Sequence, residues 1–218
     1  MTTLSLAMSV SGEHAVLVGG GTVAARKAAL LLEAGMRLTV IAPQLVPELA
    51  EAAAQGDFVW LSRIYQPGDL TGAFLVVAAT DRRAVNRQVG RDAREAGTLV
   101  NVVDAPSEGT CTFPALLRRG DLQVAVSSGG GSPAFAAAVR DELATRLDGA
   151  YAEALELISQ QREKLLTLGQ GHTYNTLFIK ELLAGGLVHL LRQGDRAGAE
   201  ALIRQRLTAS AIPPDTQS

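Results

Sequence analysis

A glycine-rich turn near the N-terminus has the residue types and spacing that bind a dinucleotide. The segment Gly19–Ala24 has the sequence GGGTVA, between a short apolar run and a helix-period segment. Gly19 permits a tight turn, Gly21 lets the backbone approach a pyrophosphate, and Ala24 lets the helix pack closely on the strand. The phosphates would lie on free N–H groups at the positive helix end. A glycine turn without a ligand is the alternative, which the agreement of strand, spacing and helix disfavours.

The pattern departs from the usual fingerprint at the end of the second predicted strand. Dinucleotide folds commonly place Asp or Glu there to bind the ribose 2′-hydroxyl, but this chain has Ile41–Gln44, with the sequence IAPQ. These residues therefore do not separate NAD from NADP. At the end of the fourth apolar run, Thr80 is expected to lie on the nicotinamide side of the cofactor, and Asp81 is expected to cap the next helix.

Asp104 is the candidate catalytic group. It follows Asn101 in the segment NVVD, at the carboxyl end of an apolar run, which is the edge of a doubly wound sheet where ligands bind. Dehydrogenating a carbon skeleton removes a hydride and a proton, and the proton needs a base within hydrogen-bond reach. Apolar surroundings would make Asp104 a better base than a carboxylate in water, and its oxygens also suit a hard divalent ion. A simple turn before Pro106 is an equally weighted alternative.

A second glycine loop, Ser127–Ser132, repeats the order of strand, glycines and helix. Its exposed N–H groups are candidates for binding substrate carboxylates, with Ser128 and Gly129 as contacts alongside Asn101. A flexible loop in which Ser132 is a plain N-cap fits the residues equally well.

Apolar runs that alternate with helix-period segments predict a doubly wound parallel sheet, an α/β fold, over the first hundred residues. The expected strands are 15–18, 37–41, 58–61, 74–79 and 99–103. The helices expected between them are 22–34, 46–55 and 82–96. A domain boundary is expected near Phe113, where the composition changes. Beyond it we expect an isolated strand at 122–127 and helices at 133–147, 151–168, 173–183 and 197–207.

The composition excludes several classes of protein. The chain has 20 Lys and Arg against 22 Asp and Glu, a net charge of −2, so nucleic acid is not an expected partner. Cys111 is the one cysteine, which rules out an internal disulfide and suits a reducing cytosol. The three histidines have no metal-ligand spacing, and no segment has the length of apolar residues that a membrane span needs. We therefore expect a cytoplasmic protein with no membrane partner.

Taken in order, these motifs resemble the precorrin-2 dehydrogenase and sirohydrochlorin ferrochelatase family, which includes the N-terminal half of bifunctional siroheme synthase. The segments that carry the resemblance are VLVGGGTVAARKAALLLEAG, VVAATD, VNVVDAP and VAVSSGGGSP, and it covers about residues 15–147. The resemblance implies a Rossmann-like NAD-binding domain over 1–113, a dimerisation segment over 114–149 and a helical region over 150–218, in a homodimer.

The resemblance also implies roles for individual residues. Asp104 matches the catalytic aspartate of the family, and Ser128 matches the serine of the loop beside the active site. Backbone contacts to NAD are implied for Thr22, Val23, Pro43 and Gln44.

The activity implied is NAD-dependent oxidation of precorrin-2 to sirohydrochlorin in siroheme biosynthesis. Some members also insert ferrous iron, for which Asp104 would be a transient ligand, and no residue of this sequence separates the two groups. A non-catalytic NAD-sensing regulatory module is the alternative function, because a dinucleotide fold does not by itself imply chemistry.

Overall fold

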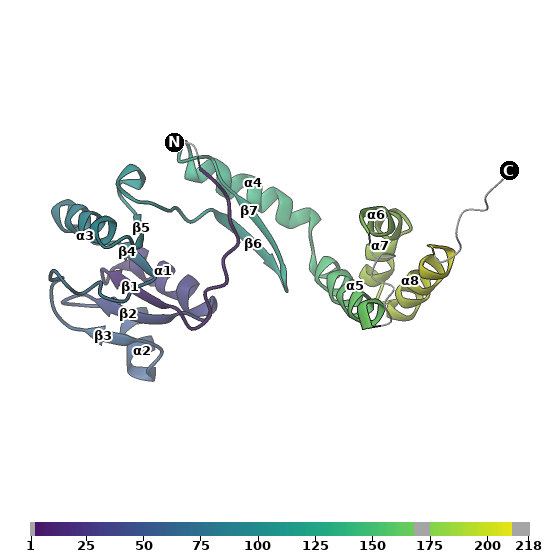
Figure 1. The fold of residues 1–218 in the computed structure, drawn as a ribbon, viewed down its shortest axis with the longest axis horizontal. Helices are drawn as coiled ribbons and strands as arrows, with labels where there is room; N and C mark the ends of the chain where they lie inside the picture. The colour runs from purple at the N-terminus through teal and green to yellow at the C-terminus, as the bar shows by residue number, and fades with distance from the viewer. Residues whose placement is uncertain (1–2, 168–174, 211–218) are drawn as a thin grey trace. The chain divides into compact units, whose positions relative to one another are not determined.

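The computed structural model describes residues 3–167 and 175–210, and the chain divides into two compact units, Met1–Phe113 and Pro114–Ser218. The first unit is a five-stranded parallel sheet flanked by helices (Figure 1). Its strands are β1 (His14–Val18), β2 (Arg37–Ile41), β3 (Val59–Leu61), β4 (Leu75–Ala78) and β5 (Leu99–Val102). Its helices are α1 (Thr22–Glu33), α2 (Pro47–Gln55), α3 (Arg83–Glu95) and the short 3-10 helix η1 (Pro106–Glu108).

The strand order β3-β2-β1-β4-β5 confirms the doubly wound α/β fold and places the topological switch point between β1 and β4. Val18 pairs with Ile41 on one side and with Ala78 on the other, so β1, β2 and β4 end at the same level. The loops that follow these strands therefore meet at one edge of the sheet, where ligands of such folds bind.

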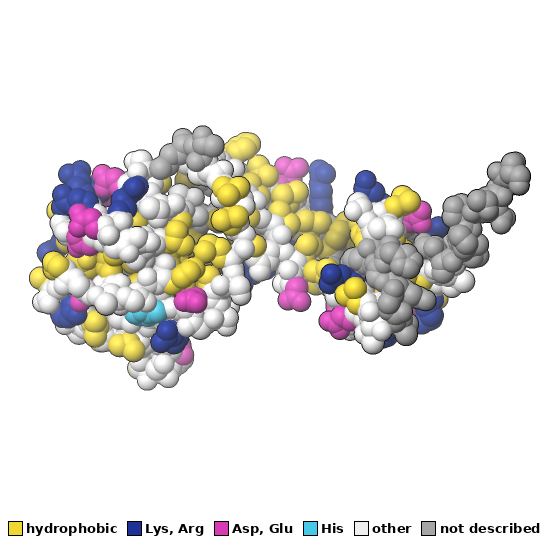
Figure 2. Space-filling view, in the orientation of Figure 1, with side chains coloured by type: hydrophobic (Ala, Val, Ile, Leu, Met, Phe, Trp, Pro, Cys, Tyr) yellow, Lys and Arg dark blue, Asp and Glu magenta, His cyan; other side chains and the backbone are white. Residues whose placement is uncertain are grey.

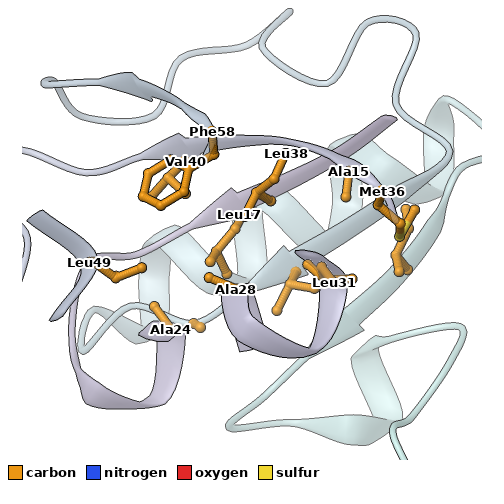
Figure 3. Packing of buried hydrophobic residues seen from close by; sticks show 13 residues of the cluster. Ala15, Leu17, Ala24, Ala28, Leu31, Met36, Leu38, Val40, Leu49 and Phe58 are labelled. Atoms are coloured by element: carbon orange, nitrogen blue, oxygen red, sulfur yellow. The ribbon is translucent and has the colours of Figure 1, made fainter. Parts of the chain in front are cut away.

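The central strands β1 and β4 are buried on both faces, which is why they are almost entirely apolar. On one face Leu17 packs against α1, whose Ala24 and Ala28 lie toward the strand (Figure 3). These small residues, one helical turn apart, let the helix approach the sheet closely. The other face packs against α3 through Val89 and Ala93.

The second unit begins with an antiparallel hairpin, β6 (Ala115–Arg119) and β7 (Leu122–Val126). Five helices follow among the described residues of this unit: α4 (Pro133–Arg146), α5 (Gly149–Thr167), α6 (Thr176–Ala184), α7 (Leu187–Arg192) and α8 (Arg196–Ser210). A separate apolar cluster that includes Leu157, Leu182 and Ile203 joins α5 to the last three helices. No helix of residues 3–167 or 175–210 is long and apolar enough to cross a membrane.

The expectation of an isolated strand at 122–127 was wrong, because β7 pairs with β6. The β6 sequence, ALLRR, lacks the alternation that indicates a half-buried strand. Gly120 and Asp121 between the strands were the available signal, since a two-residue Gly-containing turn is typical of a hairpin. Helix α7 was also missed because it has only six residues. Residues 173 and 174 of the expected helix 173–183 lie outside the described residues.

Candidate active site

The first glycine loop is held tightly between the ends of β2 and β4. A Cβ on Gly19 would lie 2.3 Å from the Ala79 carbonyl oxygen, and φ of Gly19 is +137°. A Cβ on Gly20 would lie 2.0 Å from the Gln44 carbonyl oxygen. The Val46 N–H also donates to the Gly20 carbonyl at 2.8 Å. These two glycines are therefore required by the packing of the protein itself.

Gly21 is different, because a Cβ there would meet no atom within 4 Å. Gly21 is the N-cap of α1, and no side chain caps that helix end. Thr22 and Val23 follow in the exposed first turn. Since the first N–H groups of a helix have no partner within it, this end is open to an anion.

A cavity of about 900 Å³ lies at this edge of the sheet, within the size range of small-molecule sites. Most of the residues expected from the sequence to bind the cofactor line this cavity. Thr22 and Val23, which were also expected to do so, do not line it. The expected residues that do line it are Gly19, Gly21, Pro43, Gln44 and Thr80.

The loop after β4 is held by Asn86, a fully buried residue of α3 that sequence reasoning missed. The Thr80 N–H and hydroxyl donate to Asn86 Oδ1 at 3.0 and 2.7 Å, and Asn86 Nδ2 donates to the Thr80 carbonyl at 2.9 Å. The N-cap of α3 is Arg82, whose N–H donates to Thr80 Oγ1 at 3.1 Å. The expectation that Asp81 caps this helix was wrong, because the N-cap is Arg82 and no side-chain hydrogen bond caps the helix.

Tyr65 lines another wall of the cavity and donates its hydroxyl proton to Asp92 Oδ2 at 2.7 Å. Burial raises the pKa of Tyr65, and the hydrogen bond to Asp92 raises it further. The hydroxyl therefore keeps its proton at neutral pH.

Asp104 lies after β5 and faces Arg83 of α3, with 3.6 Å between Asp104 Oδ2 and Arg83 Nε. Its side chain is 36% exposed, so it does not have the apolar surroundings that would make it a stronger base. Arg83 binds Glu108 more closely, at 2.5 Å, and this hydrogen bond is the main cause of the raised Arg83 pKa. Acidic and basic side chains gather in the region of α3, at the left of Figure 2.

Asn101 does not lie at an open edge. It is 5% exposed, and its Nδ2 donates to the Cys111 carbonyl at 3.1 Å. The side chain therefore holds the segment after β5, which is a structural role. Cys111 is half-buried and packs with the α1 face of the core, as expected of a small hydrophobic residue.

The second glycine loop satisfies its own polar groups. Ser128 Oγ accepts the Ser132 N–H at 3.0 Å, and Ser132 Oγ caps α4 by accepting the Phe135 N–H at 3.2 Å. Gly129 has φ of +62°, and its N–H donates to Ser127 Oγ at 3.2 Å. This geometry matches the plain-cap alternative.

Two family models match the chain. The model described as "Putative NAD(P)-binding" matches residues 6–115, and the model described as "Sirohaem biosynthesis protein central" matches residues 119–146. The chain belongs to the precorrin-2 dehydrogenase and sirohydrochlorin ferrochelatase family. The first of these models covers most of the Met1–Phe113 unit, which supports a nicotinamide cofactor.

Curated relatives of this family member are named siroheme synthase. That of Pseudomonas paraeruginosa is 41% identical over 207 residues, which is 95% of this chain and 44% of that protein. That of Azotobacter vinelandii is 38% identical over 211 residues, 97% of this chain and 46% of that protein. The chain thus spans less than half the length of these relatives.

A solved structure named "SirC, precorrin-2 dehydrogenase" is similar over 95% of this chain and 100% of that chain. The TM-score is 0.72 and the sequence identity is 26%. The likeness therefore extends past the nucleotide-binding unit into the hairpin and helices.

Among residues 3–167 and 175–210, no group of three or more His, Cys, Asp or Glu side chains is arranged to hold a metal ion. His172 lies outside these ranges.

Proposed function

We propose that the chain oxidises precorrin-2 to sirohydrochlorin with NAD as the oxidant. The observation that carries the proposal is the likeness to a precorrin-2 dehydrogenase over 95% of this chain and the whole of the other. A dinucleotide fold alone would support only nucleotide binding, because many chemistries share that fold. The chain's match to siroheme synthases over 95% of its own length supports the same pathway.

The residues of the cavity suit NAD. The uncapped end of α1 would take the pyrophosphate, because Gly21 leaves the space above its N–H groups open. Pro43 and Gln44 would lie along the adenosine ribose, and Thr80 would lie on the nicotinamide side. When bound, NAD supplies the hydride acceptor.

Asp104 would remove the proton that leaves with the hydride. It lies just beyond β5, and its carboxylate is partly open to solvent and thus to a substrate. Arg83 of α3 would orient this carboxylate, and its terminal Nη2 also donates to Glu108. Ser128 and Gly129 stay predicted substrate contacts, which their exposed loop permits.

Anaerobic incubation of the chain with precorrin-2 and NAD tests the proposal. We expect NADH absorbance to appear together with the sirohydrochlorin spectrum. Asp104→Ala should lower kcat by about 100-fold or more, which is the usual contribution of a general base. Asp57→Ala is the matched control, because Asp57 is an exposed carboxylate of the same unit outside the cavity. No turnover by the unmodified chain would leave the NAD-sensing module as the better account.

The homodimer, the dimerisation role of residues 114–149, the cytoplasmic location and ferrous iron as a substrate stay predictions. Iron insertion has its own test, since sirohydrochlorin and ferrous iron supplied without oxygen should yield siroheme faster than the uncatalysed background. The Asp104→Ala variant in the same assay would report whether one carboxylate serves both reactions.

A further inference from the structure

No charged side chain of the described residues lines the end of the cavity beside β2. Among the described residues that line the cavity, the charged ones are Asp81 and Arg82, and both follow β4. The lining that follows β2 is Ala42, Pro43, Gln44, Leu45 and Val46. In dinucleotide folds the adenosine ribose lies beside this strand end, where an acid binds the 2′-hydroxyl or an arginine binds the 2′-phosphate of NADP. This chain has neither among these lining residues.

An arginine nevertheless lies close to this end of the cavity. Arg63 follows Ser62, whose hydroxyl donates to the Pro43 carbonyl at 3.4 Å, and it precedes Ile64, which lines the cavity. The indole N–H of Trp60 also donates to the Ala42 carbonyl, at 2.9 Å. Two side-chain hydrogen bonds therefore attach the segment around Arg63 to the end of β2.

The Arg63 guanidinium is turned to Asp69 and does not line the cavity. Its two terminal nitrogens donate to the two Asp69 oxygens at 2.8 and 2.7 Å, and one of them also donates to the Ile64 carbonyl at 3.1 Å. The Asp69 side chain is only 11% exposed. A paired carboxylate of this kind occupies the fork of an arginine and neutralises its charge.

We infer that Asp69 determines cofactor specificity, because it withholds Arg63 from the ribose end of the cavity and so denies NADP a partner for its 2′-phosphate. The inference rests on the proposed nucleotide site. NAD, which has only a hydroxyl there, needs no cation. NADP would bring a dianion to a wall without positive charge, which costs desolvation without compensation.

Asp69→Asn is the variant that isolates this effect. Asp69 Oδ2 also accepts the Gln66 N–H at 2.8 Å. An asparagine oxygen can keep that bond, while the negative charge that pairs with Arg63 is removed. Asp69→Ser offers a second acceptor should the asparagine disturb the loop. Asp57→Asn makes the same charge change on an exposed residue of the same unit, away from the cavity.

Two further variants locate the effect. Arg63→Gln combined with Asp69→Asn removes the released cation and should abolish any gain. Gln44→Arg puts a cation directly on the cavity wall and should strengthen NADP binding whether or not Arg63 is involved.

The experiment is a titration of each protein with NAD and with NADP, followed by the fluorescence of Trp60, the only tryptophan of the chain. Released Arg63 should tighten NADP binding by about tenfold or more, the range of a charge-assisted hydrogen bond, with NAD affinity changing much less. Unchanged NADP affinity in folded Asp69→Asn and Asp69→Ser proteins, or a gain that persists in the double variant, would overturn the inference. If the unmodified chain binds neither nucleotide, the proposed function fails instead.

Discussion

The two glycine loops have almost the same local sequence order, yet the protein uses them in opposite ways. At Gly19 and Gly20 an added Cβ would strike backbone oxygens at 2.3 and 2.0 Å, whereas at Gly129 and Gly130 it would meet nothing within 4 Å. The helix after the first loop has no side-chain cap, and the helix after the second is capped by Ser132. The first loop therefore leaves the N–H groups of its helix end open to a ligand, whereas the second loop caps its helix end with its own serine.

The difference follows from the strands on either side. β1 lies between β2 and β4 in a parallel sheet, so its loop is packed between two other strand ends. β7 has a single partner, β6, in a two-stranded sheet, and its loop has no such neighbours among the described residues of that sheet. We therefore expect a strand, glycines and a helix to bind an anion where the surrounding sheet fixes the loop and leaves the helix N–H groups free.

The largest expected effect is that of Gly20→Ala. Its methyl group would overlap the Gln44 carbonyl oxygen, so we expect a loss of about 3 kcal/mol or more in the free energy of unfolding, at the upper end of overpacking costs. Gly130→Ala, with φ of +87° but open space, should cost only about 1–2 kcal/mol. Urea unfolding, followed by Trp60 fluorescence for the first and by far-UV circular dichroism for the second, measures both. Equal losses would erase the contrast between the loops.

Gly21→Ala should separate ligand binding from folding. An alanine fits the φ of −87° and ψ of −176° at this residue and meets no protein atom within 4 Å, so the unfolding curve should barely change. The methyl group would instead occupy the space meant for a pyrophosphate, and we expect NAD affinity to fall by at least about tenfold, or about 1.4 kcal/mol. Undiminished affinity would mean that the first loop does not receive the phosphates.

Ser132→Ala should affect stability alone. It removes the hydroxyl that accepts the Phe135 N–H, and the loss of such a cap costs about 1 kcal/mol. Urea unfolding of the second unit measures this loss, and nucleotide titration should be unaffected. A change in substrate KM without a change in stability would instead favour the second loop as an anion site.

Acidification should have the smallest effect on stability, and this effect should involve both units of the chain. Hydrogen bonds from Arg63, Arg83 and Arg192 lower the pKa of Asp69, Glu108 and Asp148, respectively. A carboxyl whose pKa is lower in the folded state stabilises the protein above its unfolded pKa, near 3.8 to 4.5 for these groups, and this stabilisation is lost as the pH falls through the folded pKa. The thermal unfolding temperature should thus not change through these groups between pH 7 and pH 5, and it should fall below about pH 4. The Asp69→Asn variant should lose less stability on acidification, because it lacks one of these three carboxyl groups.

Much of the first unit was predictable from the order of residues. The apolar runs and their helix-period partners predicted all five strands of the sheet. The signal was clearest for β1 and β4, because strands buried on both faces have few polar interruptions. Strand β6 escaped prediction, since a partly exposed hairpin strand with the sequence ALLRR has no clear period. The second unit was correspondingly harder to predict.

The sequence by itself determined the position of the glycine turn, the end of the second strand without an acid, and the order of motifs that resembles the family. These are local features, each carried by a few neighbouring residues. Only the tertiary structure decided which polar groups are available: Asn101 is buried and bonded to a backbone carbonyl, Asn86 holds Thr80, and Arg63 is paired with Asp69. Partners six or more residues apart in the chain make these contacts, and the folded backbone determines which donor meets which acceptor.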